Sequence, residues 1–393
     1  MAVEKNKIKK VFFGGWYQRT TLHLTEIYDF LSEGESSLSL SKEKLGDLHT
    51  GLGLSEVTRE TGNLEYIRAV THDGINIHYY EDGLYIFSLE SDRIDEAKDT
   101  ISHYYEEKFS PAIAYIFSLG APTPKELANI KTTHPIVVSV LSSNPESFPL
   151  EEKYGKVYGS ISSKELIVKK TAGFIFLITK PEYESSLESL VEMQVFFREF
   201  KDQLQRYLAI HRDLWEEITN IKEKKMVKGS EVEKIRLKLD GYQKTINLIS
   251  SRINQMGAYV HTRADIAKEA KLTEHLAVLF QYKFDVLTNT QSYIKEIWVM
   301  TNNYLNAAIQ VVNEIKNQAT NKSIQSLQII TTYGVVGGII GYLSRDSLPK
   351  ITGNGLLYFI VLIIATFAVN KIVSRAYAIT KYKLTFTERV EGI

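Results

Sequence analysis

Apolar residues gather in two segments near the C-terminal end of the chain, residues 326–343 and 355–373, and a short polar stretch, residues 344–354, separates them. A helix needs about 20 mostly apolar residues to cross a hydrocarbon core of about 30 Å, and both segments approach that length. The chain before them carries most of the charge and has no comparable apolar run. The pattern predicts a large water-soluble body tethered by a transmembrane hairpin at 326–373 with an external loop at 344–354.

Basic residues flank the hairpin on both outer sides, while only Arg345 and Lys350 lie between the two segments. Because basic residues gather on the cytoplasmic side of a membrane, this distribution predicts a multi-pass protein of the cell membrane with both termini in the cytoplasm. The first residues have no apolar stretch typical of a signal peptide, so insertion is expected to depend on the hairpin. The flanking basic residues are Lys316, Lys322, Lys371, Arg375, Lys381, Lys383 and Arg389.

Short apolar segments alternate with turn residues in the first part of the chain, residues 1–180. Residues 70–89 are typical of a β-hairpin, because Ile75, Ile77 and Tyr79 alternate with polar residues before the turn 81–83. Residues 135–141 and 173–179 are rich in apolar and β-branched side chains and predict buried strands, while residues 22–31 and 93–108 have helical spacing. We expect a cytoplasmic α/β (α+β) domain over 1–180.

Long helices are predicted after Pro181, which suits a first helical position, because no further proline follows until the external loop. The pattern predicts two long helices over 181–272, the second with a capping box at Ser230 and Glu233. A stalk helix over 273–325, with Thr273 as its N-cap, is expected to continue unbroken into the first membrane helix. Its apolar seam is predicted at Leu276, Phe280, Leu287, Ile294, Ile297, Tyr304, Ala308, Val311 and Ile315.

A helix of this length must bury its seam against other helices, because helix propensity alone does not stabilise it. Two sets of helices could bury this seam: the two preceding helices of the same chain, or equivalent helices from several copies of the chain. A basic cytoplasmic tail, residues 374–393, follows the hairpin.

Polar and small residues follow one track of the first membrane helix. Since polar groups at membrane depth are expected to face protein or water, this track predicts a sheltered face. The G-x-x-x-G spacing of Gly334 with Gly338 fits either close helix packing or a pore lining. The track consists of Asn317, Thr320, Ile324, Leu327, Thr331, Gly334 and Gly338, with Asn321, Gln325, Gln328 and Thr332 on the neighbouring track.

Composition excludes several classes of protein. The formal net charge is zero, with 47 basic and 47 acidic residues, which argues against a nucleic-acid partner. There is no cysteine, so disulfides and thiolate metal sites are excluded. The sequence contains no phosphate-binding loop, zinc-protease motif or nucleophile elbow, and we expect neither an enzyme nor a covalently bound cofactor.

This order of segments resembles the CorA-type divalent metal-ion transporter superfamily over most of the chain. That family has a cytoplasmic α/β domain, long helices, a stalk that continues as the first membrane helix, a short external loop and a second membrane helix. Its Gly-Met-Asn signature falls here at Gly341, Tyr342 and Leu343, with Pro349 downstream. The glycine and the proline match, whereas tyrosine and leucine replace methionine and asparagine.

The resemblance implies a homopentamer that transports divalent cations, with Mg²⁺ as substrate and regulator and the first membrane helices lining a central pore. Ile324 and Leu327 would form a constriction and Thr331 a polar ring. Leu343 cannot present the side-chain oxygen that the signature asparagine supplies, so Gly341 carbonyls or Asp346 would have to select the ion.

The resemblance further implies a cytoplasmic basic ring of Lys371, Arg375, Lys381 and Lys383, residues whose simpler role is contact with anionic lipid. It also makes Asp285 on the stalk a candidate regulatory metal ligand. A second hypothesis is a membrane-anchored coiled-coil scaffold of the same fold that has lost ion transport. That hypothesis accounts for the changed signature, but it does not account for the polar track that enters the membrane in register with the stalk.

Overall fold

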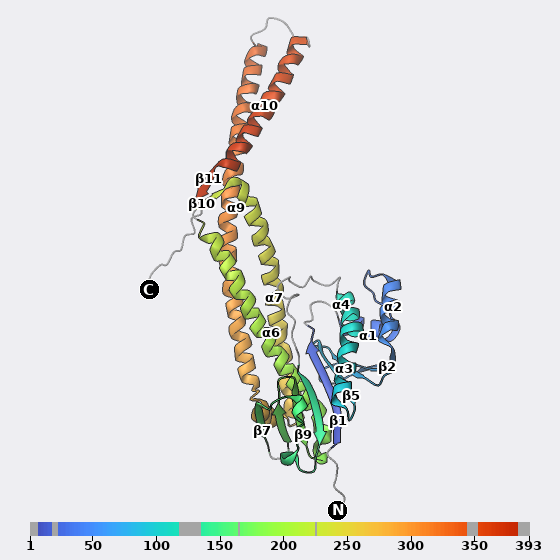
Figure 1. The fold of residues 1–393 in the computed structure, drawn as a ribbon. Coiled ribbons are helices and arrows are strands. Elements are labelled where there is room, and N and C mark those ends of the chain that lie inside the picture. Colours follow the sequence, from blue (N-terminus) through green and yellow to red (C-terminus); the bar gives the residue numbers. More distant parts are fainter. Residues whose placement is uncertain are drawn as a thin grey trace, which may run out of the picture. The chain divides into compact units, whose positions relative to one another are not determined.

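The computed structural model describes residues 7–17, 23–117, 135–163, 166–224, 226–343 and 353–383. The chain divides into two compact units. Unit 1 consists of residues 1–210 and 248–296, and unit 2 consists of residues 211–247 and 297–393. Three long helices contribute to both units: α6 (Glu184–Lys222), α7 (Gly229–Glu269) and α9 (Phe284–Leu343) (Figure 1).

A nine-stranded sheet forms the centre of unit 1, with strand order β2-β3-β4-β5-β1-β6-β9-β8-β7. All neighbouring pairs are antiparallel except β6 and β9, which are parallel. The strands are β1 (Lys7–Trp16), β2 (Leu54–Glu60), β3 (Tyr66–Thr71), β4 (Asn76–Tyr80), β5 (Leu84–Glu90), β6 (Ile136–Leu141), β7 (Gly159–Ser162), β8 (Leu166–Lys170) and β9 (Phe174–Thr179). The expected α/β fold is confirmed for this unit.

The hairpin predicted from alternating residues is present as β4 and β5, which pair with Ile77 opposite Phe87. Its turn depends on Gly83, whose φ of 87° lies in the left-handed region. A Cβ atom there would lie 2.0 Å from the Tyr17 carbonyl oxygen, so the turn excludes any side chain. The two predicted buried strands are also present, as β6 and β9.

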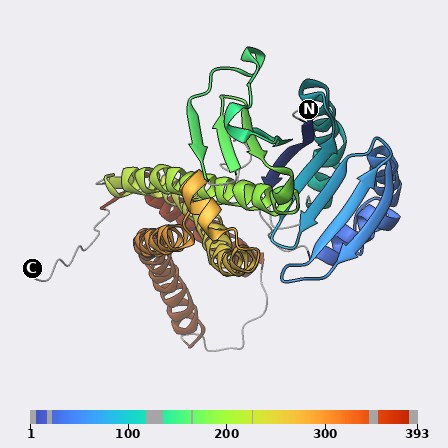
Figure 2. The ribbon, with the colours of Figure 1, turned by 90° about the horizontal axis from the view of Figure 1, so that it is seen from below.

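Helices cover both faces of the sheet, as Figure 2 shows. Alternate residues of β1 face opposite sides. Phe13 contacts Tyr105 at 4.9 Å between ring centroids, whereas Trp16 stacks on Phe200 of α6 at 5.7 Å. The helices on the first side are α1 (Leu24–Glu33), α2 (Lys42–Leu52), α3 (Ile94–Tyr104), the π-helical turn η1 (Tyr105–Phe109) and α4 (Ser110–Phe117).

A fully buried ion pair joins α7 to the β4–β5 turn within unit 1. Arg263 donates from Nε to Asp82 Oδ2 at 2.8 Å and from Nη2 to Oδ1 at 3.1 Å. The guanidinium also lies 4.5 Å from the centre of the Tyr80 ring. Neither charged side chain exposes more than 1% of its surface, so each depends on the other for compensation of its charge.

The long helices match the prediction at most of their ends. A 3-10 turn, η4 (Pro181–Tyr183), leads into α6, which ends at Lys222. Glu233 was predicted to take part in a capping box, but its carboxylate instead accepts hydrogen bonds from Arg236 at 2.7 Å and from Lys316 at 3.2 Å. These hydrogen bonds, that of Arg236 first, lower the pKa of Glu233 to about 2.

The stalk predicted to start at Thr273 is interrupted, and this part of the prediction is wrong. Residues Thr273–His275 (α8) and the π-helical turn Leu276–Phe280 (η5) form a separate segment. Gln281 then adopts a left-handed φ of 58°, which ends that segment, and α9 starts at Phe284. From there α9 is continuous for 60 residues, so the predicted junction between stalk and first membrane helix has no break.

Unit 2 contains the remaining parts of α6, α7 and α9, together with α10 (Gly353–Ile379) and a two-stranded sheet. α10 runs antiparallel to the C-terminal part of α9 (Figure 1). The strands are β10 (Met226–Lys228), between α6 and α7, and β11 (Lys381–Lys383), directly after α10. They pair antiparallel with Lys228 opposite Lys381. Two further 3-10 turns of the described residues, both in unit 1, are η2 (Pro145–Ser147) and η3 (Glu152–Tyr154).

Replacing Gly229 by alanine is expected to open the β10–β11 pair. The added Cβ would lie 2.1 Å from the Tyr377 carbonyl oxygen, and Gly229 N–H donates to Thr380 O at 3.1 Å in the same contact. Overpacking of this kind costs about 1–3 kcal/mol, so exchange of the paired amides should accelerate about tenfold or more. Hydrogen exchange of peptides covering β10 and β11 measures this. Gly241→Ala is the control, because its Cβ would meet nothing within 4 Å, and unchanged exchange in Gly229→Ala would contradict the assignment.

Candidate functional site

α9 buries one regular line of side chains inside unit 2. The spacing alternates between three and four residues, which is the heptad pattern of packed helices. This seam consists of Trp298, Thr301, Leu305, Ala308, Val312 and Ile315. The sequence placed Ala308 and Ile315 in it correctly, but it placed Ile297, Tyr304 and Val311 one residue early, and these three are only half-buried.

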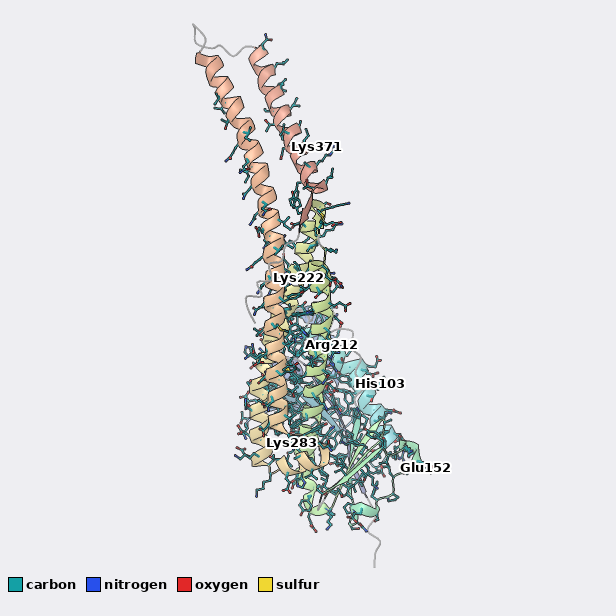
Figure 3. All side chains as sticks on the ribbon, turned by 90° about the vertical axis from the view of Figure 1, so that its left-hand side faces the viewer. His103, Glu152, Arg212, Lys222, Lys283 and Lys371 are labelled. Carbon is teal, nitrogen blue, oxygen red and sulfur yellow. The ribbon has the colours of Figure 1, made fainter. Side chains whose placement is uncertain are left out.

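Polar and aromatic contacts fix how α9 is rotated against α6. His211 Nδ1 lies 2.7 Å from the Thr301 hydroxyl, and burial, with a smaller effect of Arg212, lowers the pKa of His211. Trp215 stacks on Tyr304 with ring centroids 4.2 Å apart. Lys222, which Figure 3 labels on α6, lies over the Tyr304 ring at 4.1 Å. The seam of α9 is therefore occupied by helices of its own chain.

The opposite face of α9 carries a line of exposed carboxamide side chains, which we call the amide stripe. At about 100° per residue, the stripe lies roughly 150° around the helix axis from the seam. The stripe consists of Asn303, Asn306, Gln310, Asn313 and Asn317, all exposed. Residues 297–313 contain no charged side chain at all. Exposed helix faces normally carry charges, so this face has the composition of a surface that contacts something other than bulk water.

The amide stripe continues in the same three-four spacing into the predicted pore track. Because α9 is unbroken to Leu343, the track lies on the same helix face by register. The structure thus brings the predicted pore-lining residues together on one face, in the order Thr320, Ile324, Leu327, Thr331, Gly334, Gly338 and Gly341. Of the side chains described there, Ile324 is 46% exposed.

The last part of α9 and most of α10 expose large apolar side chains. On α9 these are Ile324, Ile329, Val335 and Val336, and on α10 they are Leu357, Ile360, Val361, Ile363, Ile364, Phe367, Ile372 and Ile379. A single chain in water would not favour an apolar surface of this extent. When only the described residues are considered, no helix combines the length and apolarity required to span a membrane.

The structure describes some of the residues predicted to form the ion filter or to bind metal, but not all of them. Gly341, Tyr342 and Leu343 form the end of α9, and Asp346 lies outside the described residues. Asp285 is exposed in the first turn of α9, where a carboxylate complements the helix dipole. No group of three or more His, Asp or Glu side chains suited to a metal ion occurs among the described residues.

The predicted basic residues lie at the C-terminal end of α10 and beyond it. Lys371 and Arg375 are exposed on α10, and Figure 3 marks Lys371 there. Lys381 and Lys383 belong to β11, so pairing with β10 brings them to the connection between α6 and α7. The four positions thus lie on the C-terminal part of α10 and on the β10–β11 pair that follows it.

No known protein-family model matches this sequence, and no curated protein is significantly similar to it. The amide stripe was missed by reasoning from the sequence, although two signals could have found it. The first is the absence of charge over 297–313, and the second is the three-four spacing of the asparagines together with Gln310.

Proposed function

We propose that the chain is a CorA-like homopentameric channel or transporter for divalent cations, with Mg²⁺ as its substrate and α9 lining the pore. It would be a multi-pass protein of the cell membrane with both termini in the cytoplasm. The observation that carries the proposal is the amide stripe, which is uncharged, exposed, opposite the seam and in register with the predicted pore track.

The two faces of α9 differ in what covers them, and this difference supports the assembly of several copies of the chain around α9. The seam is already covered by α6 and α7 through contacts such as His211–Thr301 and Gln243–Asn302, at 2.7 Å in both cases. The opposite face presents the exposed, self-complementary amides of the stripe. Carboxamides donate and accept hydrogen bonds, so equivalent helices from other copies could face one another across an axis.

The chemistry of the stripe suits a hydrated cation. Mg²⁺ gives up its water shell reluctantly, and neutral carboxamide oxygens can accept hydrogen bonds from that shell without trapping the ion. Farther along the track, Ile324 and Leu327 would form an apolar constriction that controls wetting. The pore would therefore recognise the hydrated ion along the stripe and restrict it at the constriction.

Insertion into a membrane is supported by the exposed apolar side chains of α9 and α10 together with the run LLYFIVLIIATFAV at 356–369. Lipid would cover these side chains. Lys371 and Arg375 at the end of α10 would contact anionic headgroups of the cytoplasmic leaflet.

The alternative is a membrane-anchored scaffold that has lost transport. Leu343 in place of the signature asparagine favours it. The glycines at 337, 338 and 341 also favour it, since a Cβ at any of them would meet nothing within 4 Å and the surface is open to close helix packing.

Native mass spectrometry of the full chain, released from detergent with and without millimolar Mg²⁺, tests the assembly. We expect a pentamer, because a pore along α9 requires several copies around an axis. A monomer or dimer under both conditions would overturn the channel and leave the scaffold as the better explanation.

A further inference from the structure

A cavity of about 260 Å³ lies in unit 1 where the chain enters α9. The residues that line it come from α6, from η5 and its following linker, and from the first turns of α9. The linker has an unusual backbone, because Gln281 has a φ of 58° without being glycine and the preceding turn is π-helical. Left-handed non-glycine residues and π-helical turns cost free energy and are concentrated at functional sites.

Stacked aromatic rings form the apolar wall of the cavity. The Tyr282 ring stacks on Phe197, with ring centroids 4.7 Å apart and planes at 9°, and on Phe280, with centroids 5.5 Å apart and planes at 19°. Phe284 packs against Phe197 at 4.5 Å. Leu204 and Leu287 add aliphatic surface to the lining. This wall is suited to a flat apolar group.

The polar part of the lining is positive. Lys201 and Lys283 both line the cavity, and among the described residues no carboxylate lines it. Figure 3 marks Lys283 at the start of α9. Neither lysine forms an ion pair within the part of the chain that the structure describes. Gln205, Gln281 and Thr290 supply neutral hydrogen-bonding groups beside them.

We propose that this cavity binds a small organic anion with a flat apolar ring, the chemistry shared by aryl phosphates and nucleoside monophosphates. The ring would lie against the wall of Phe197, Phe280 and Tyr282, and the anionic group would contact Lys201 and Lys283. The volume is just below the range of about 300–1,000 Å³ usual for ligand pockets, which suits a single ring with one phosphate. This site is independent of ion transport.

Saturation-transfer NMR of the full chain in phosphatidylcholine nanodiscs tests the proposal with phenyl phosphate, benzyl alcohol and inorganic phosphate. Phenyl phosphate is expected to bind at least about tenfold more tightly than benzyl alcohol or inorganic phosphate. Only phenyl phosphate can contact both the aromatic wall and the two lysines. AMP in the same assay distinguishes a nucleotide from a simpler aryl anion. If benzyl alcohol binds as tightly as phenyl phosphate, or if phenyl phosphate does not bind, the proposal is overturned.

A double variant and a control variant test whether phenyl phosphate binds in this cavity. Lys201→Gln with Lys283→Gln should weaken phenyl phosphate binding by about tenfold or more, because both charged hydrogen-bond donors to the anionic group are lost. Lys295→Gln is the matched control, an exposed lysine of α9 that does not line the cavity, and should leave binding unchanged. Equal binding in the double variant and the native chain would reject the site, whatever the outcome of flux measurements.

Discussion

Replacing Asp82 by alanine is expected to lower the free energy of unfolding of unit 1 by about 3–5 kcal/mol. The change leaves the Arg263 guanidinium 1% exposed and without its carboxylate. It also removes the acceptor of the Leu84 N–H, which lies 3.0 Å from Asp82 Oδ1. Urea titration followed by hydrogen exchange of peptides from β4 and β5 measures the loss.

Two further variants separate the ion pair from its surroundings. Asp82→Leu combined with Arg263→Leu removes both charges and should cost less than Asp82→Ala alone, because no unpaired charge stays buried. Glu269→Ala breaks only the exposed contact with Asn63, 2.6 Å long, and should change stability by about 0.5 kcal/mol or less. An Asp82→Ala protein as stable as the Glu269→Ala protein would contradict the structure.

Replacing Asn306 and Asn313 together by leucine is expected to reduce Mg²⁺ flux by about tenfold or more, because apolar rings dewet a pore that the amides keep hydrated. Flux is measured in proteoliposomes with an entrapped magnesium-sensitive dye. Both residues are exposed members of the amide stripe, so the substitutions leave the seam intact.

Gln318→Leu is the matched control for the flux measurement. Gln318 is an exposed amide on the same helix, where it donates to Glu314 at 3.2 Å, but its register places it outside the stripe. We expect flux close to that of the native chain. Equal flux in all three proteins would argue that the stripe does not line the conducting path.

Local patterns made much of the fold predictable. The hairpin of β4 and β5, the strands β6 and β9 and the start of α6 depend on alternation, β-branched residues and proline, which act over a few residues. The order of the nine strands was not predictable, because β1 pairs with β6 across more than a hundred residues and nothing in either strand specifies that partner.

The missed features of α9 share a different cause. The break before Phe284 depends on Gln281 in a left-handed conformation, which is stabilised by aromatic packing of its neighbours rather than by its own preference. The rotation of α9 depends on contacts such as His211 with Thr301, ninety positions apart. A shift of one residue in the predicted seam was enough to hide which face carries the asparagines.

The pairing of β10 with β11 restricts how the chain can be threaded. β11 follows α10 directly, and β10 lies at the junction of α6 and α7, so the chain after α10 must return to that junction, beside α9. If α9 and α10 cross a bilayer, the number of crossings is therefore even. A nascent chain whose second helix failed to cross could not complete this small sheet, and the sheet would form only in correctly inserted molecules.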